Sequence, residues 1–363
     1  MFLEKLNVLN FKNHSDSQLI LDANINCFVG NNGSGKTNLL DAIHYLSLTK
    51  SFFVKQDAFN IKHHQPYMSI EGVFNKNNAT EVIQCAIKTG AKKVFRRNKK
   101  TYQKLSDHIG LFPMVMVSPT DTELLLGGSD LRRKYMDSVI SQFDSNYLEA
   151  LMNYNQLLAQ RNAILKSSQR SASNLEIYDE QLMPLAQIIF DKRKLFLDDL
   201  STVFLKYYQA ISGTNESVDI AYHSQLFEGN FIQLAQKNFQ KDITLQFTSC
   251  GIHKDDLIFN IDNYLIKKIG SQGQQKTYLL ALKLAQFDFM KDTLGFKPML
   301  LLDDIFDKLD DNRVEHLMTL VHHQHFGQIF VTDTHPQRSK HIFNKIDAKF
   351  KVFLIKNGNV EKE

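Results

Sequence analysis

The segment from Gly30 to Thr37 constrains this chain more than any other, because it matches the phosphate-loop pattern G-x-x-x-x-G-K-[ST]. An apolar stretch at residues 25–29 precedes it, and residues 39–46 carry leucine and isoleucine at helical spacing. A strand, a glycine-rich loop and a helix together allow successive backbone amides to turn inward around phosphate oxygens. The sequence therefore predicts an α/β fold with a phosphate-binding site between the strand and the helix.

Individual residues of this loop have distinct expected roles. Lys36 is expected to reach the β- and γ-phosphates of a nucleotide, and Thr37 to bind Mg²⁺. A helix that begins near Lys36 adds the positive end of its dipole to the site. We expect the nucleotide to be bound by the whole loop, which comprises Gly30, Asn31, Asn32, Gly33, Ser34, Gly35, Lys36 and Thr37.

A second constraint is the run from Pro298 to Leu302, which is followed by Asp303 and Asp304. A continuous apolar run is typical of a parallel strand buried on both faces, and ligands bind at the carboxyl end of such strands. We expect Asp303 to hold Mg²⁺, directly or through water. Asp304 is expected to orient or deprotonate an attacking water. Both roles depend on the phosphate loop, since a pair of acids alone is most simply a strand-to-loop turn.

Two segments flank this acidic strand. Residues 270–276 place a Ser and a Gly just before a helical pattern, which is typical of a second phosphate-binding surface and also of an ordinary capped helix. Residues 328–335 read as a strand that ends in His335. His335 is a candidate contact for the nucleotide, although a His before Pro336 also simply ends a strand.

The texture of the chain changes in its middle third. Between Gly128 and Gly213 there is no glycine, and Pro184 is the only proline. Helical spacing predicts two long helical runs at 130–166 and 175–212, separated by a serine-rich turn. We therefore expect a helical arm at residues 126–213, inserted into an α/β head formed by residues 1–125 and 214–363.

The order of these segments resembles the ABC-type ATPase heads, a group that includes transporter motors and SMC proteins, and within that group the RecF family. The motifs that carry the resemblance span nearly the whole chain and are residues 30–43, 118–119, 132–137, 251–257, 270–277 and 300–304. The resemblance implies a two-lobed protein, in which an ABC-type P-loop ATPase head carries an inserted helical arm.

The resemblance also implies an activity and partners. RecF-like proteins bind ATP with Mg²⁺, form a homodimer on it, bind DNA, and act with RecO and RecR to help RecA replace single-strand-binding protein at gaps. Asp304 stands where most ABC ATPases carry Glu, and RecF-like proteins resemble this chain in having Asp there. This departure implies slow ATP hydrolysis, so that ATP acts as a switch.

The resemblance also assigns specific roles to five residues. Ser271 and Gly273 correspond to the signature residues that contact the γ-phosphate of ATP held by the other protomer, and Gln274 belongs to the same motif. Asp310 of the x-L-D motif is a further nucleotide-binding residue, and His335 corresponds to a γ-phosphate sensor. Asp307 departs from the family, where Ser is often found.

A DNA-binding surface on this chain must be local, because the formal net charge is only +4. Residues 92–104 contain seven basic residues and no acid, and Asn98 is placed to form a hairpin tip. Such clusters neutralise phosphates, although a solvated hairpin has the same composition. Arg132 and Arg133 form a second basic group, which is also typical of an exposed helix start. The candidate DNA-binding residues are Lys92, Lys93, Arg96, Arg97, Lys99, Lys100, Arg132 and Arg133. The preferred DNA, whether single-stranded, duplex or a gap junction, stays open.

Other classes of protein fit less well. A transporter motor gives no reason for the basic cluster, and an SMC protein needs longer heptad arms. A nuclease would need an added domain of about 100 residues, and only about 50 follow Asp310. Small-molecule kinases do not need the 271–274 motif. Three widely spaced cysteines, no signal-peptide pattern and no apolar run of membrane-spanning length favour a cytoplasmic protein.

Overall fold

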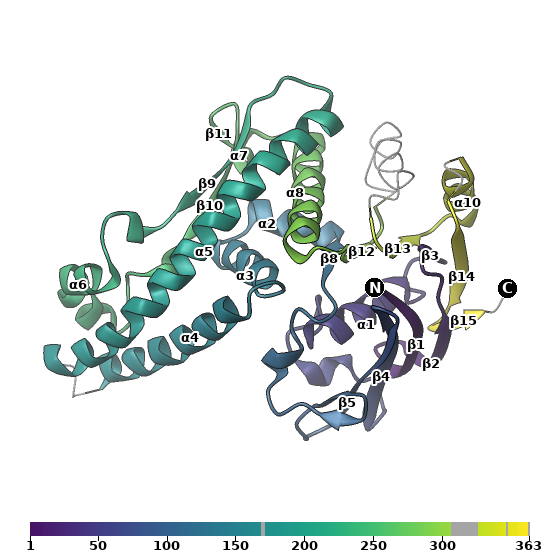
Figure 1. Ribbon diagram of the computed structural model, residues 1–363, viewed down its shortest axis with the longest axis horizontal. Coiled ribbons are helices and arrows are strands. Elements are labelled where there is room, and N and C mark those ends of the chain that lie inside the picture. The colour runs from purple at the N-terminus through teal and green to yellow at the C-terminus, as the bar shows by residue number, and fades with distance from the viewer. Residues whose placement is uncertain (168–170, 306–325, 346–347, 362–363) are drawn as a thin grey trace. The chain divides into compact units, whose positions relative to one another are not determined.

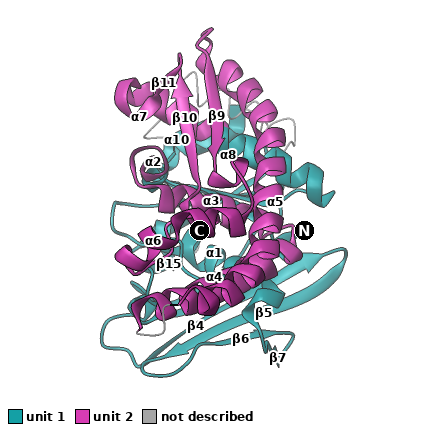
Figure 2. Cartoon of the chain, turned by 90° about the vertical axis from the view of Figure 1, so that its left-hand side faces the viewer, with its two compact units in different colours: residues 1–121, 282–363 teal, residues 122–281 magenta. Residues whose placement is uncertain are grey.

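The computed structural model describes residues 1–167, 171–305, 326–345 and 348–361. The chain forms two compact units (Figures 1 and 2). Unit 1 comprises Met1–Asp121 and Leu282–Glu363, and unit 2 comprises Thr122–Ala281. The phosphate loop and the two acids therefore belong to unit 1, while the long helices belong to unit 2.

A six-stranded sheet in unit 1 contains the predicted buried strands. In spatial order its strands are β15 (Asn359–Glu361), β14 (Phe350–Lys356), β3 (Ile25–Val29), β13 (Ile329–Asp333), β12 (Met299–Leu302) and β8 (Met114–Val117). All neighbours are parallel except β14 and β15. Strands β3, β13, β12 and β8 are buried at every position, which explains why their sequences are mostly apolar.

A second six-stranded sheet in unit 1 is antiparallel throughout. Its strands, in spatial order, are β2 (His14–Ile20), β1 (Phe2–Phe11), β4 (Tyr67–Lys76), β5 (Ala79–Lys88), β6 (Val94–Arg97) and β7 (Lys100–Thr101). Strands β2 and β7 form the two edges of the sheet.

Helix α1 (Lys36–Leu48) follows the phosphate loop and packs on both sheets, since it contacts β1 and β4 of one and β13 and β8 of the other. Eleven of its 13 residues are buried, more than the leucine and isoleucine positions within residues 39–46. Even Asp41 is buried, where its carboxylate pairs with Lys12 Nζ at 2.6 Å. Helix α1 is thus held by strands of both sheets, and it begins at the phosphate loop.

Unit 2 consists mainly of helices. Its helices are α2 (Thr122–Leu126), α3 (Ser129–Ile140), α4 (Ser145–Lys166), α5 (Ala172–Ser212), α6 (Phe231–Leu245) and α7 (Ile266–Ile269). A small antiparallel sheet contains β11 (Tyr264–Leu265), β10 (Asp256–Ile261) and β9 (Val218–His223), in that order. Helix α8 (Gln272–Leu294) begins in unit 2 and continues into unit 1, which also contains α10 (Pro336–Lys345).

The helical character of the middle third is confirmed, with one break that periodicity alone did not reveal. The predicted run at 130–166 is two helices, because Asp144 caps α4 by accepting a hydrogen bond from the amide of Tyr147. The predicted run at 175–212 is the single helix α5, which accommodates Pro184 within its length. Ser171 caps α5 by accepting from the amide of Asn174.

The second unit extends further along the chain than the predicted arm at residues 126–213. Residues 214–281 were assigned to the head, but the structure groups them with unit 2. The reason is strand pairing: β9 and β10 pair with each other, β9 contacts α5, and α6 also packs on α5. The sequence of residues 214–281 predicts strands and helices, but it does not reveal which of the two units they pack in.

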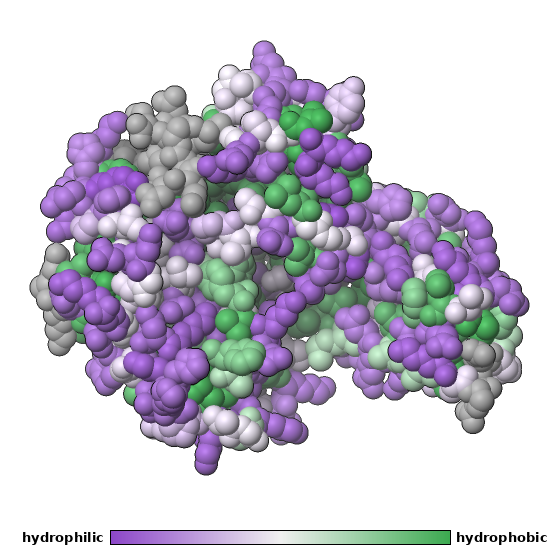
Figure 3. Space-filling model, turned by 180° about the vertical axis from the view of Figure 1, so that it is seen from behind, coloured by the Kyte–Doolittle hydropathy of each residue, from purple (hydrophilic) through white to green (hydrophobic). Residues whose placement is uncertain are grey.

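No helix among the described residues is long and apolar enough to cross a membrane. The 41-residue helix α5 has the length, but acidic and basic residues such as Asp191, Lys192 and Lys194 interrupt its apolar positions. Hydrophilic residues also cover most of the face drawn in Figure 3, where apolar residues gather in small patches.

Unit 2 encloses two arginines among acidic partners. Arg161 is fully buried, and its guanidinium contacts Asp179 at 2.6 Å and Asp242 at 2.8 Å. Burial raises the pKa of Asp179, against the opposing effect of Arg161. Arg193 is buried in the same way and pairs with Asp137 and Asp255. These ion pairs join residues far apart in the sequence, so they depend on the complete unit.

We expect Arg161→Met to lower the free energy of unfolding by about 3–5 kcal/mol, because it leaves buried carboxylates without their cation. Lys194→Met is the matched control, since Lys194 is exposed and pairs with Asp198 one helical turn away. Urea denaturation followed by circular dichroism measures both. Equal stability of the two variants would contradict the importance of the buried cluster.

Candidate nucleotide-binding site

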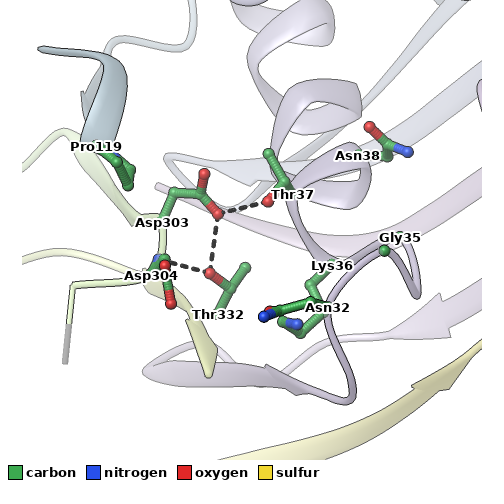
Figure 4. A pocket seen from close by; sticks show the side chains of 10 residues that line it. Asn32, Gly35, Lys36, Thr37, Asn38, Pro119, Asp303, Asp304 and Thr332 are labelled. Atoms are coloured by element: carbon green, nitrogen blue, oxygen red, sulfur yellow. Dashed lines mark hydrogen bonds between the residues drawn. The ribbon is translucent and has the colours of Figure 1, made fainter. Parts of the chain in front are cut away.

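Four parallel strands of unit 1 bring the candidate residues to one edge of the sheet. The register pairs Leu302 at the end of β12 with Val331 of β13 and with Val117 at the end of β8. The next strand, β3, ends at Val29 opposite Asp333. The pocket at this edge has a volume of about 270 Å³ and is lined by Asn32, Gly33, Gly35, Lys36, Thr37, Asn38, Pro119, Asp303, Asp304 and Thr332 (Figure 4).

The phosphate loop contains backbone conformations and close contacts that glycine permits. Gly33 and Gly35 have φ angles of 79° and 116°, in the left-handed region that glycine adopts without strain. A Cβ at Gly30 would lie 2.2 Å from the carbonyl oxygen of Ile355, so no larger residue fits there. The loop therefore uses its glycines for conformation at two positions and for a close approach at the third.

Lys36 is folded back over the loop that precedes it. Its Nζ atom donates to the carbonyl oxygens of Gly30 at 2.7 Å and Asn31 at 3.0 Å. The ammonium group is buried with the rest of the side chain. A positive charge is thus held at the centre of a loop whose shape suits a phosphate.

The first turn of α1 adds further donors and one unsatisfied hydroxyl. Helix α1 begins at Lys36 after Gly35, and the amides of a first helical turn have no acceptor within their own helix. Among the described residues, the buried Ser34 Oγ has no hydrogen-bond partner. Unpaired buried polar atoms are rare in proteins, so this hydroxyl is consistent with a ligand bound in the loop.

Asp303 joins the acidic strand to the phosphate loop. Its Oδ1 atom accepts a hydrogen bond from Thr37 Oγ1 at 2.8 Å and another from Thr332 Oγ1 at 2.9 Å (Figure 4). Burial raises the pKa of this carboxyl, while the two hydroxyls favour its charged form. A buried carboxylate of this kind is stabilised by a cation, and Thr37 and Asp303 lie close enough to share one.

Asp304 lies next to this pair in an unusual backbone conformation. Its φ angle is 49°, which is uncommon outside glycine. Its amide donates to Thr332 Oγ1 at 2.8 Å, so one threonine fixes both acids of the pair. Asp304 lines the pocket and is less buried than Asp303, which suits a residue that acts on a water.

Within the part of the chain that the structure describes, no group of three or more His, Cys, Asp and Glu side chains is placed to hold a metal ion. Mg²⁺ does not require such a group, since it is usually held by one or two protein ligands together with phosphate oxygens and waters. The pair of Thr37 and Asp303 is thus compatible with a Mg²⁺–nucleotide site.

The predicted signature segment is the start of helix α8. Ser271 Oγ accepts from the amide of Gln274 at 3.2 Å, while Gln274 Oε1 accepts from the amide of Ser271 at 2.7 Å. This reciprocal capping leaves Ser271 exposed and places Gly273 in the first helical turn. Gln274 Nε2 also donates to Glu216 at 2.8 Å. The segment is therefore a capped helix start, and it also presents an exposed polar surface.

Of two further predicted nucleotide contacts, one does not line the pocket and the other lies outside the described residues. His335 follows β13 with an exposed side chain, and its amide donates to Asp333 Oδ1 at 3.0 Å. It does not belong to the pocket lining. Asp310 lies outside the described residues. Its role and that of His335 stay predictions from the resemblance.

The basic segment at 92–104 is a hairpin, as expected, with Asn98 and Lys99 at its tip at φ angles of 50° and 69°. Two of its cations are engaged within the protein. Arg97 forms a two-pronged ion pair with Glu81 at 2.6 and 2.9 Å, and Lys93 contacts Asp57 at 3.0 Å. The exposed cations of the hairpin are Lys92, Arg96, Lys99, Lys100 and Lys104.

The second predicted basic step, at the start of the helical arm, does not fit an exposed DNA-binding surface. Arg132 is buried, and it pairs with Asp256 at 2.6 Å and donates to the carbonyl oxygen of Gly127 at 2.8 Å. Arg133 is half-buried and donates to the carbonyl oxygen of Asp255 at 2.7 Å. Both cations hold unit 2 together, because their partners lie about 120 residues away in the sequence and were not apparent from it.

Three residues that line the pocket had not been assigned a role there, namely Asn38, Pro119 and Thr332. Thr332 has the largest part, since its hydroxyl joins Asp303 to the amide of Asp304. A threonine near the end of an apolar strand can indicate a site residue if that strand lies between two strands that carry the site. The sequence alone does not reveal this strand order.

Comparisons with known proteins agree with this geometry. Residues 2–361 match the family described as the RecF/RecN/SMC N terminal domain. The chain is 50% identical over 357 residues to the DNA replication and repair protein RecF of Flavobacterium johnsoniae, covering 97% of this chain and 99% of the relative. It is 46% identical to RecF of Phocaeicola vulgatus, covering 99% of this chain and 98% of the relative.

Solved structures show the same fold. The recombination mediator protein RecF in the RecFOR pathway, solved with ATP, has a TM-score of 0.90 at 30% identity, over 100% of this chain and 97% of that one. An Smc head bound to the C-winged helix domain of ScpA has a TM-score of 0.60 at 14% identity, over 99% and 96%, a likeness in fold alone. The predicted ABC-type ATPase head is thereby confirmed, and the chain belongs to the RecF family of DNA replication and repair proteins, within the wider group of RecF, RecN and SMC N-terminal domains.

Proposed function

We propose that this chain is an ATP-dependent DNA-binding protein of gap repair and replication, in which ATP binding acts as a switch. ATP with Mg²⁺ binds in the unit 1 pocket, two copies of the chain dimerise on it, and the dimer binds DNA. Slow hydrolysis resets the protein, which acts with RecR and RecO to help load RecA. The observation that carries the proposal is that Asp303, at the end of β12, accepts a hydrogen bond from Thr37 of the phosphate loop.

The residues of the pocket fit ATP and Mg²⁺. Lys36 and the amides at the start of α1 supply positive charge and donors for the phosphates, and Ser34 supplies an unpaired hydroxyl. Thr37 and Asp303 would hold Mg²⁺, which offsets the negative charge of the phosphates when bound. The relatives support this assignment, since a RecF structure with ATP has the same fold.

Asp304 is the proposed base for hydrolysis. It lines the pocket beside the phosphate loop, and Thr332 fixes its backbone. The Asp side chain is one methylene shorter than the Glu that most ABC-type heads carry at this position. Its carboxylate reaches less far from the backbone, so a water must come closer to the end of β12 to be deprotonated. This geometry supports slow turnover, as a switch requires.

Dimerisation is proposed from the two kinds of phosphate-binding segment in the chain. Each chain has the phosphate loop in unit 1 and the Ser271 segment in unit 2, and in ABC-type heads such segments act on one nucleotide from opposite protomers. The Ser271 side chain is exposed and caps α8, so it is accessible to a second copy. A dimer with two ATP molecules at its interface completes both sites.

DNA binding is proposed for the exposed face of the β6–β7 hairpin. Lys92, Arg96, Lys99 and Lys100 are exposed, and no acid occurs between residues 92 and 104. Contacts of this kind go to phosphates and carry no sequence information. Lys93, Arg97, Arg132 and Arg133, which have partners within the protein, are left out of the proposed surface.

Asp304→Asn is expected to separate hydrolysis from binding, because it keeps the shape of the side chain but removes the base. ATP affinity should stay near that of the wild type, while single-turnover hydrolysis falls by about 10²-fold or more. Asp303→Asn should instead weaken the Mg²⁺ dependence of binding as well. Unchanged hydrolysis in Asp304→Asn, measured with radiolabelled ATP and excess DNA, would contradict the assigned role.

Ser271→Arg is expected to block the ATP-induced dimer, because a bulky cation would occupy the place of the γ-phosphate contact. Nucleotide binding by the monomer should persist. Ser171→Arg is the matched control, since Ser171 is also an exposed serine that caps a helix. Light scattering should show an ATP-dependent doubling of mass for the wild type and control only. The same wild-type mass with and without ATP would contradict the ATP-dependent dimer.

The triple variant Arg96→Gln, Lys99→Gln, Lys100→Gln is expected to weaken DNA binding alike for every sequence. Binding should also lose salt dependence, since each duplex phosphate contact contributes about −0.9 to the log–log slope. Lys166→Gln, Lys206→Gln, Lys237→Gln removes three exposed charges from unit 2 as a control. Fluorescence anisotropy at several salt concentrations measures both. If the triple variants behave alike, the hairpin is merely solvated.

A further inference from the structure

The outer side of the phosphate loop is held by two turns that lie far from it in the sequence. One joins β1 to β2 and contains Asn13, which precedes His14 at the start of β2, and the other joins β14 to β15 and contains Gly358. Asn13 Nδ2 donates to the carbonyl oxygen of Gly33 at 3.3 Å, and the amide of Gly358 donates to that of Ser34 at 2.8 Å. Together with a contact from His14, three successive carbonyl groups of the loop are engaged from outside.

His14 forms the third of these contacts. Its Nε2 atom lies 3.0 Å from the carbonyl oxygen of Gly35, and its Nδ1 atom lies 2.9 Å from Ser17 Oγ. A carbonyl oxygen only accepts, so Nε2 carries the proton in this hydrogen bond. Burial lowers the pKa of His14, which favours the neutral ring with one donor and one acceptor. Nδ1 is then an acceptor for the Ser17 hydroxyl, whose other acceptor is the carbonyl oxygen of Gly358 at 3.4 Å.

Sheet topology explains why the C-terminal turn reaches the loop. Strand β14 pairs in parallel with β3, and Leu354 lies opposite Val29, so both strands end at the same edge of the sheet. Asn357 and Gly358 have φ angles of 50° and 75°, as in a tight two-residue hairpin turn. A Cβ at Gly358 would lie 2.2 Å from the carbonyl oxygen of Asn13, so the two turns are in backbone contact.

These contacts bear on the direction of the loop's amides. In a planar trans peptide, the carbonyl of one residue and the amide of the next point to opposite sides. Holding the carbonyls of Ser34 and Gly35 outward therefore turns the amides of Gly35 and Lys36 toward the inner side of the loop. Amides in these positions are the donors that a phosphate loop presents to its ligand.

We propose that Gly358 and His14 are positioning residues for the phosphate loop, which fix the peptide planes on either side of Gly35 for phosphate binding. The inference rests on the proposed ATP site and adds to it two elements outside the phosphate-loop motif. The hairpin near the end of the chain is thus part of the nucleotide site, although none of its residues lines the pocket.

Gly358→Ala tests the C-terminal turn, because the added Cβ at a φ of 75° forces the turn away from Asn13 and Ser34. The affinity for ATP, measured by calorimetry with Mg²⁺, is expected to fall about tenfold. Gly90→Ala is the matched control, since Gly90 has the same φ of 75° and an added Cβ there meets no described atom within 4 Å. The control carries the same backbone strain and should bind ATP like the wild type.

His14 supplies a second, independent test. His14→Leu removes the donor to Gly35 and is expected to lower ATP affinity about fivefold to tenfold. His14→Gln retains a donor at similar reach and should recover most of the affinity. Rescue by the donor, rather than by the size of the side chain, distinguishes positioning from packing. Urea denaturation of each variant confirms that the protein measured is folded.

The outcomes separate this inference from the function on which it rests. A wild-type chain that binds no ATP contradicts the proposed function. The positioning inference alone is overturned if the wild type binds ATP and two comparisons show no difference. Gly358→Ala must then bind ATP as tightly as Gly90→Ala, and His14→Leu as tightly as His14→Gln. If Gly358→Ala does not fold, the His14 pair decides by the same criterion.

Discussion

The hydrogen bonds that Asp303 accepts from Thr37 and Thr332 are the interaction on which the site depends. They join residues that are 266 and 29 positions apart in the sequence, and they form because β3, β13 and β12 run parallel and end at one edge. A buried carboxylate without a cation is costly, so two hydroxyls stabilise it. In the proposed function, Thr37 and Asp303 would hold Mg²⁺ in place of the hydrogen bond between them.

This constraint explains which parts of the site were predictable. The phosphate loop and the Asp303–Asp304 pair are recognisable because each is a contiguous motif with a fixed neighbour in secondary structure. Thr332 was not assigned, since its role arises only from the order of strands in the sheet. The contacts of His14 and Gly358 with the loop also join residues distant in the sequence, and each joins one donor to a backbone carbonyl oxygen of the loop.

Charge was the least reliable guide from sequence alone. Arg132 appeared as part of a basic step, yet it is buried against Asp256, and Arg97 of the basic hairpin pairs with Glu81. Sequence reveals how many cations a segment has but not which of them find an internal partner. Domain limits were uncertain for a related reason, because residues 214–281 join unit 2 through strand pairing and helix packing.

Binding of ATP to the unit 1 pocket is the central claim, and calorimetric titration of ATP with Mg²⁺ into the wild type and Lys36→Ala tests it most directly. Lys36 places its ammonium group within the loop, so its removal should lower affinity by about tenfold to a hundredfold. The wild type should bind one ATP per chain, and the variant should unfold at the same urea concentration. Equal affinity in the two proteins would place the nucleotide elsewhere and contradict the account.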